Sequence, residues 1–225
     1  MNPWILLDSA AVPGNGGELR LYRRGAEFSI RIAGRGELMN SRVHGSEEAL
    51  AGQTCDRLAA GSAPRLLIGG LGMGFTLAAA LRRIGAQGRV VVAELVPGVV
   101  AWNRGVLGAP AGHPLRDPRV SVRMTDVGRV LRTGPQAFDA ILLDVDNGPE
   151  GLTRRENDWL YQMQGLQAAY AALRPGGVLA LWSAGPDRGF PQRLRKAGFA
   201  VDEVRVRARG TKGARHILWF ARCGA

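Results

Sequence analysis

The sequence has few of the residues that mark disulfide-rich, metal-binding or membrane proteins. Its 225 residues include only two cysteines, Cys55 and Cys223, which have no metal-ligand spacing and no partner motif. We therefore expect two free thiols in a reducing cytosol and no metal site. No run of about 18 apolar residues is present, which argues against a membrane span. The opening residues, MNPWILLDSAAVPG, lack a basic segment, so we predict no signal peptide and a cytoplasmic location.

Lysine is almost absent as well. Only Lys196 and Lys212 accompany 28 arginines, and the formal net charge is +11. The densest part runs from Arg188 to Arg222, where ten residues are basic. A basic surface can follow phosphate groups, so nucleic-acid binding stays open. Because no aromatic-rich or known binding module accompanies the charge, we interpret it as a solvated face. A homodimer is also left open.

The N-terminal part has the pattern of short β-hairpins. Glycine-rich breaks separate three segments in which apolar and polar residues alternate, namely 4–8, 18–24 and 27–34. A helix is predicted over 46–60, with Ser46 as its N-cap and two acidic residues in its first turn. This pattern divides the chain into an N-terminal β-hairpin extension, 1–45, and a larger domain, 46–225.

In the larger domain, strand-like and helix-like segments alternate. Apolar strand patterns cover 65–70, 89–95, 119–126, 138–146, 178–184, 201–209 and 215–222. Helical patterns cover 75–85, 97–107, 157–177 and 190–199. Such alternation predicts an α/β fold, a mostly parallel sheet with helices on both faces.

A glycine-rich loop follows the first of these strands. Gly69, Gly70, Gly72 and Gly74 lie between this strand and a predicted helix. Glycine lets the backbone turn sharply and approach a ligand closely, and the helix N-terminus offers free N–H groups. The loop therefore predicts a site for a nucleotide or a related ligand.

Acidic residues end the next three strands. Glu94 stands about 20 residues after Gly74, where an acid can accept both hydroxyls of a ribose. Asp126 ends the third strand and Asp144 the fourth. The carboxyl ends of parallel strands form one edge of a sheet, so these side chains should face one ligand. NAD stays open as that ligand, although no second catalytic domain is present for a dehydrogenase.

The motifs, in this order, resemble those of the spermidine synthase (aminopropyltransferase) family, within the class I S-adenosylmethionine-dependent fold. The family has a β-rich N-terminal segment, a GGGDGG-like loop, an acid after strand two, a D-A-like pair after strand three, and an Asp-containing loop followed by Gly-Pro. This chain has GGLGMG, Glu94, Asp126 with Val127, and DVDNGPEGLT. The resemblance covers about Glu18 to Ser183. It implies a Rossmann-like seven-stranded sheet that binds S-adenosylmethionine or its decarboxylated form, with Asp126 and Val127 at the adenine.

The resemblance also suggests how the stretch FDAILLDVDNGPEGLT is used. The first Asp of the family's loop orients and deprotonates the attacking amine, and by position this is Asp144. Asp146, Asn147 and Glu150 are then candidates to bind the far end of a small-molecule acceptor.

Three departures from the family pattern bear on the reaction. The loop acid that holds the amine of the decarboxylated donor falls at Gly72, a Gln falls at Glu37, and a Tyr falls at Ser46. Because the amine-binding acid is missing, we expect the full donor and methyl transfer to a small amine-type or other nucleophile. Aminopropyl transfer from the decarboxylated donor is the first alternative, and a non-catalytic nucleoside-binding module is the second.

Overall fold

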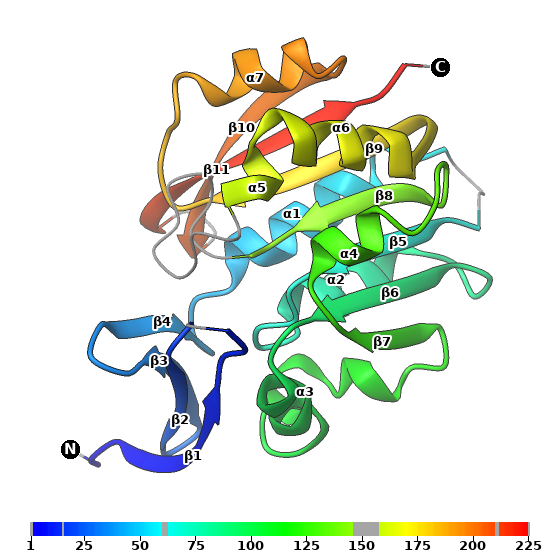
Figure 1. Ribbon diagram of the computed structural model, residues 1–225. Helices are drawn as coiled ribbons and strands as arrows, with labels where there is room; N and C mark the ends of the chain where they lie inside the picture. Colours follow the sequence, from blue (N-terminus) through cyan, green and yellow to red (C-terminus); the bar gives the residue numbers. More distant parts are fainter. Residues whose placement is uncertain (1, 15, 60–62, 146–157, 210–211, 225) are drawn as a thin grey trace.

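A computed structural model describes residues 2–14, 16–59, 63–145, 158–209 and 212–224 (Figure 1). Within these residues the strands form a four-stranded sheet, in the order β1-β2-β3-β4, and a seven-stranded sheet, in the order β10-β11-β9-β8-β5-β6-β7. The predicted α/β fold is therefore confirmed. In the described ranges, no helix is long and apolar enough to cross a membrane. Both cysteines are free thiols.

The N-terminal sheet is an antiparallel meander. Its strands are β1 (Ile5–Ala11), β2 (Glu18–Arg24), β3 (Glu27–Ile32) and β4 (Gly36–Asn40). The first three match the predicted segments, and β4 was not predicted. Leu21 and Ile30 are fully buried and belong to the same apolar core as the larger sheet. The indole N–H of Trp102 also donates to Asp8, 2.7 Å away, which joins β1 to the larger domain.

The larger sheet has its first strand near the middle. Its strands are β5 (Arg65–Gly69), β6 (Arg89–Glu94), β7 (Val120–Met124), β8 (Phe138–Leu143), β9 (Leu173–Ser183), β10 (Ala200–Arg209) and β11 (Lys212–Arg222). Strands β5 to β9 are parallel, and β11 runs antiparallel to both of its neighbours. The chain proceeds from β5 to β6 and β7 on one side, then returns to β8 on the other. Open α/β sheets bind ligands beside such a reversal, at the carboxyl ends of the strands.

Successive strand residues face opposite sides of the sheet, and both sides are buried. In β5, Leu66 and Ile68 join one apolar core and Leu67 joins the other. The first core includes residues of α1 (Gly45–Cys55), α2 (Phe75–Arg83) and α3 (Pro97–Arg104). The second includes residues of α4 (Val127–Leu131), α5 (Asp158–Tyr161), α6 (Met163–Ala172) and α7 (Phe190–Lys196). Two short 3-10 helices, η1 (Ala109–Ala111) and η2 (Pro114–Arg116), precede β7.

The start of α1 differs from the prediction. The N-cap is His44 and not Ser46, which lies inside the first turn. The Ser46 hydroxyl donates to the Glu47 carboxylate at 2.7 Å and contacts His216 Nδ1 at 2.9 Å. The prediction was wrong because this hydroxyl has long-range and side-chain partners, which a local capping rule does not consider.

The long helix predicted over 157–177 is also wrong. The described part of this segment is two helices, α5 and α6, separated at Gln162, whose backbone is extended (φ −84°, ψ 166°). Helix α6 ends at Ala172, and β9 begins with the next residue. The residue before a proline disfavours helical geometry, so Pro175 prevents the helix from continuing through Arg174.

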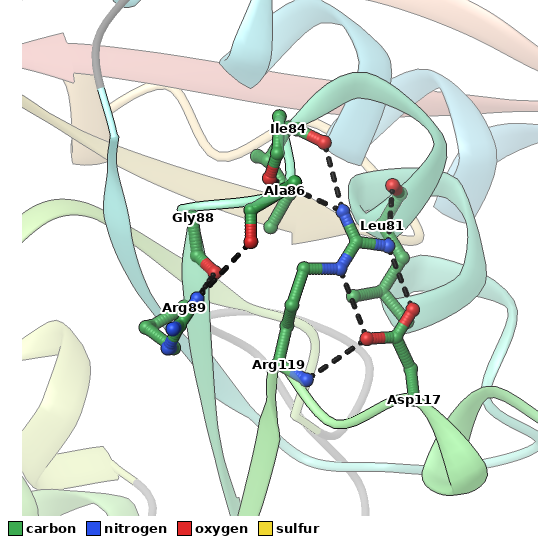
Figure 2. A network of polar contacts seen from close by, with 8 residues as sticks. Leu81, Ile84, Ala86, Gly88, Arg89, Asp117 and Arg119 are labelled. Atoms are coloured by element: carbon green, nitrogen blue, oxygen red, sulfur yellow. Dashed lines mark hydrogen bonds and ion pairs between the residues drawn. The ribbon is translucent and has the colours of Figure 1, made fainter.

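Arg119, just before β7, ties the start of this strand to the C-terminal end of α2 (Figure 2). The Arg119 guanidinium donates to the carbonyl oxygens of Leu81 and Ile84, at 3.1 and 2.9 Å. It also donates twice to the Asp117 carboxylate, at 2.9 and 2.7 Å. The last carbonyls of a helix have no partner within the helix, so Arg119 satisfies groups that would otherwise need water.

Candidate active site

The glycine loop brings the backbone of β5 against the end of β8. Gly70 has φ +86°, and a Cβ there would lie 2.6 Å from the Asp144 carbonyl oxygen. Gly72 has φ +51°, and a Cβ there would lie 3.1 Å from Met39 Sδ. Both positions therefore favour glycine by conformation, and Gly70 also needs it for space, because its contact is with backbone. Gly69 is buried within β5, and Gly74 is the left-handed N-cap of α2.

Glu94 fixes the shape of this loop. Its side chain is buried, and its two oxygens accept the backbone N–H groups of Leu71 and Val96, each at 2.8 Å. Burial raises the pKa of Glu94, and these backbone donors partly offset the increase. Each carboxylate oxygen has a second lone pair, so the group can still accept a ligand hydroxyl.

Asp126 and Val127 begin α4 beside Glu94. One oxygen of Asp126 accepts the Gly128 N–H at 2.8 Å, and this capping bond fixes the carboxylate at the helix start. Val127 is buried, and its side chain would contact any Cβ at Gly69. Asp126 thus has one oxygen used by the fold and one that the structure leaves for a ligand.

Five of the predicted donor-binding residues line one cavity, which we call the Glu94 cavity. They are Gly70, Gly72, Glu94, Asp126 and Val127. Gly69 and Gly74 support the loop without lining this cavity. The opposite wall comes from the N-terminal sheet, through residues that include Leu19, Ile30, Leu38 and Met39. An apolar pocket with a few fixed polar groups is typical of a small-molecule site.

Asp144 follows β8 and lines a second cavity as well, which we call the Glu47 cavity. Leu38, Met39 and Gly72 also line both, so the two cavities meet at the glycine loop. The Thr76 hydroxyl donates to Asp144 at 2.6 Å and holds its carboxylate at this junction. Burial raises the pKa of Asp144, and the bond from Thr76 opposes the increase. Among the predicted acidic site residues that the structure describes, Asp144 alone borders both cavities.

The Glu47 cavity contains three carboxyl groups from three elements. Glu37 comes from β4, Glu47 from α1, and Asp144 from the end of β8. Trp182 and His216 line the same cavity. Among the described residues that line either cavity, none is lysine or arginine. An acidic lining with no lysine or arginine among the described residues, in a chain of net charge +11, favours a cationic ligand.

Glu47 is the acidic residue that sequence reasoning placed only in a helix turn. Its neighbour Glu48 points elsewhere and pairs with Arg82 at 3.0 Å. Glu47 instead lines the cavity, where burial and the nearby Asp144 raise the pKa of its carboxyl to about 7. Thr76, Trp182 and His216 were missed too. The three predicted acceptor residues, Asp146, Asn147 and Glu150, lie outside the described residues.

The raised pKa of Glu47 predicts a pH-dependent effect on stability. Because the folded chain holds this proton up to about pH 7, the associated stability is present below the ordinary glutamate pKa of 4.5 and is lost as the pH rises towards 7. Replacing Glu47 by Gln should raise the free energy of unfolding by about 1–3 kcal/mol at pH 8. At pH 4.5 the two proteins should differ little.

Denaturant unfolding at both pH values measures this difference. Glu48→Gln is the matched control, since Glu48 is adjacent in sequence but is ion-paired at the surface. It should show no such gain at pH 8. Equal effects of Glu47→Gln at both pH values would contradict a shifted Glu47.

Comparison with known proteins finds similarity in structure only. No protein-family model matches the chain, and no curated protein does. A spermidine synthase from Thermotoga maritima has a TM-score of 0.76 and 18% identity, over 97% of this chain and 72% of that one. A spermidine synthase in complex with the transition state analogue AdoDATO gives 0.79 and 19%, over 97% and 74%. A probable spermidine synthase from Corynebacterium glutamicum gives 0.65 and 15%, over 99% and 81%.

The matches cover 97–99% of this chain, so both of its sheets are included in the comparison. At such low identity the likeness concerns the fold. It agrees with the resemblance that the glycine loop, Glu94, Asp126 and Asp144 indicated. The chain therefore has the spermidine synthase-like fold, a class I methyltransferase-type α/β domain preceded by an antiparallel β-sheet.

Proposed function

We propose that this chain is a transferase that moves the aminopropyl group of decarboxylated S-adenosylmethionine to a small cationic amine. The observation that carries the proposal is the acid-lined Glu47 cavity and its junction with the Glu94 cavity at Asp144. The nucleoside of the donor would occupy the Glu94 cavity. The acceptor would occupy the Glu47 cavity, with its nitrogen at the junction.

The charge of the two cavities favours the decarboxylated donor over the full one. Full S-adenosylmethionine carries a carboxylate, and the described lining residues offer it no lysine or arginine. Two like charges about 5 Å apart repel by about 3 kcal/mol at an effective dielectric constant of 20. Loss of that carboxylate leaves a sulfonium and an ammonium, both of which suit the acidic lining.

Gly72 therefore leads to a different conclusion from the one drawn from sequence alone. The amine-binding acid that the spermidine synthase family has at this position is absent, which suggested the full donor and methyl transfer. However, Glu37 and Glu47 line the same cavity as Gly72, so carboxylates reach this region from other elements. Solved spermidine synthases of the same fold, one of them with AdoDATO, also support the aminopropyl alternative over the methyl interpretation.

Asp144 has the position that such a reaction requires. Transfer needs an uncharged nitrogen in line with the carbon that leaves the sulfonium, and positioning supplies much of the rate. The carboxylate, held by Thr76, can accept a hydrogen bond from the amine and then its proton. Met39 and Gly72 form the wall at the point where donor and acceptor would meet.

Product analysis tests this proposal. The protein is incubated with decarboxylated S-adenosylmethionine and a series of diamines, and mass spectrometry follows methylthioadenosine and the aminopropylated amine. We expect both products in equal amounts. Diols of the same chain length should give neither, because they lack the positive charge that the Glu47 cavity selects.

Two other outcomes would contradict the proposal. Adenosylhomocysteine formed from the full donor would restore the methyl-transfer interpretation. Nucleoside binding without any product, across all amines tested, would indicate the non-catalytic nucleoside-binding module.

A further inference from the structure

Three side chains at the wall of the Glu47 cavity form a chain of hydrogen bonds. Ser46 Oγ lies 2.7 Å from Glu47 Oε2 and 2.9 Å from His216 Nδ1. Ser46 is fully buried, and Glu47 and His216 are partly buried and line the cavity. The chain joins α1 to β11, residues that are 170 positions apart. Binding of an amine by charge needs the Glu47 carboxylate alone, so the other two groups require a separate explanation.

The proposed transfer must dispose of a proton. The acceptor nitrogen forms a bond to carbon while the carbon–sulfur bond breaks, and the sulfur leaves as a neutral thioether. The acceptor amine is an ammonium ion at neutral pH and must be uncharged to attack, so one proton is released for each nitrogen that reacts. Asp144 can accept this proton, but it is held by Thr76 at the inner junction of the cavities. To act again, it must pass the proton on.

We propose that Glu47, Ser46 and His216 form the route by which this proton leaves Asp144. The inference rests on the proposed function. Glu47 shares the cavity with Asp144 and receives the proton there, Ser46 relays it, and His216 carries it to the outer part of the cavity. Glu47 acts on the reacting groups through Asp144, and Ser46 and His216 act through Glu47.

The same three side chains can form hydrogen bonds whether Glu47 is ionised or protonated. When Glu47 is ionised, the Ser46 hydroxyl donates to it and accepts from His216 Nδ1–H. When Glu47 is protonated, it donates to Ser46, whose own hydrogen turns to an unprotonated His216 Nδ1. A hydroxyl has one donor and two acceptor positions, so the exchange needs no movement of heavy atoms.

The surrounding charges favour proton transfer from Asp144 towards His216. Glu47 faces Asp144 from β8 and Glu37 from β4, and His44 and Glu48 lie near it on α1, where Arg82 from α2 neutralises Glu48. Like charges and burial make the Glu47 carboxyl ready to hold a proton at neutral pH. Burial lowers the pKa of His216, so the imidazole would release the proton to solvent rather than keep it.

Three substitutions distinguish a proton relay from a purely structural role of these side chains, through their effects on kcat and KM. Ser46→Ala should lower kcat by about 100-fold, the lower end of the range for proton-transfer catalysis, and leave KM within about twofold. His216→Asn keeps a hydrogen-bond donor near the position of Nδ1, but its amide cannot carry a proton. It should lower kcat as much as Ser46→Ala does. Added imidazole should restore part of kcat in His216→Ala, since the small base can reach the vacated space.

Thr54→Ala and His113→Asn are the controls. Thr54 has a buried hydroxyl on the same helix, which donates to the Leu50 carbonyl, and His113 lines neither cavity. Both variants should keep kcat within about twofold. Full kcat in Ser46→Ala, or in His216→Asn, would overturn the route.

A titration that needs no turnover makes the result independent of the proposed function. The chain has three histidines, so imidazole signals can be assigned by NMR with single substitutions. The His216 signals should show a second inflection near pH 7, where Glu47 ionises; Glu47→Gln should remove it, and Ser46→Ala should weaken it. Absence of this second inflection, or its full retention in Ser46→Ala, would overturn the route. Its presence in a protein that transfers nothing to any amine would instead reject the proposed function alone.

Discussion

Asp144→Asn should reduce kcat by about 10²- to 10⁴-fold, the range for loss of proton-transfer catalysis. The amide keeps the shape and can still pair with Thr76, whose hydroxyl now donates to Asp144 at 2.6 Å. It removes the negative charge and the basic site at the junction of the two cavities. In the proposed binding mode the nucleoside would be held elsewhere, by the glycine loop, Glu94 and Asp126, so donor affinity should change less than about tenfold.

Steady-state kinetics and calorimetry on the same preparation measure the two effects. Asp139→Asn is the matched control, because Asp139 is in β8 itself, pairs with Arg174 at 2.9 Å and lines neither cavity. It should leave kcat within about twofold. If Asp144→Asn loses donor binding while bound donor still reacts at the normal rate, Asp144 is a donor-side residue.

Glu94→Ala is expected to weaken nucleoside binding by about 10- to 100-fold, equivalent to about 1.4–2.8 kcal/mol. The substitution removes the carboxylate that would accept the ribose hydroxyls. It also leaves the N–H groups of Leu71 and Val96 without their partner. An unsatisfied buried donor costs about 1–3 kcal/mol, so the free energy of unfolding should fall as well.

The two effects are separable by experiment. Binding of methylthioadenosine is measured by calorimetry at a temperature where circular dichroism shows the variant to be folded. Glu48→Ala serves as the control, since Glu48 lines neither cavity. Unchanged affinity in a folded but less stable Glu94→Ala would mean that Glu94 only shapes the loop.

The parts of this site that sequence could predict depend on local pattern. Strand periodicity and the spacing from the glycine loop placed Glu94, Asp126 and Asp144 at one edge of the sheet. Each of these residues ends or follows a parallel strand, so its position depends only on that strand and on the sheet it joins. Alternation also predicted the strands β1 to β3, but not that their sheet forms a wall of both cavities.

The missed residues depend on packing between distant elements. Glu47 faces the cavity only because α1 begins at Gly45 after His44, and a start one residue later would change the direction of every side chain. Trp182 and His216 meet through the antiparallel pairing of β11 with β9, in which Trp182 lies opposite Leu218. A register of that kind is set by the whole sheet. Likewise, Gly72 alone did not predict the donor, because Glu37 and Glu47 reach the same cavity from other elements.

The most direct test of the account compares the two donors by calorimetry on the unmodified protein. The acid-lined cavities, with no lysine or arginine among their described lining residues, predict that decarboxylated S-adenosylmethionine binds about 10- to 100-fold more tightly than the full donor. Methylthioadenosine should likewise bind more tightly than adenosylhomocysteine. Equal affinities, or tighter binding of the two carboxylate-bearing compounds, would contradict the account.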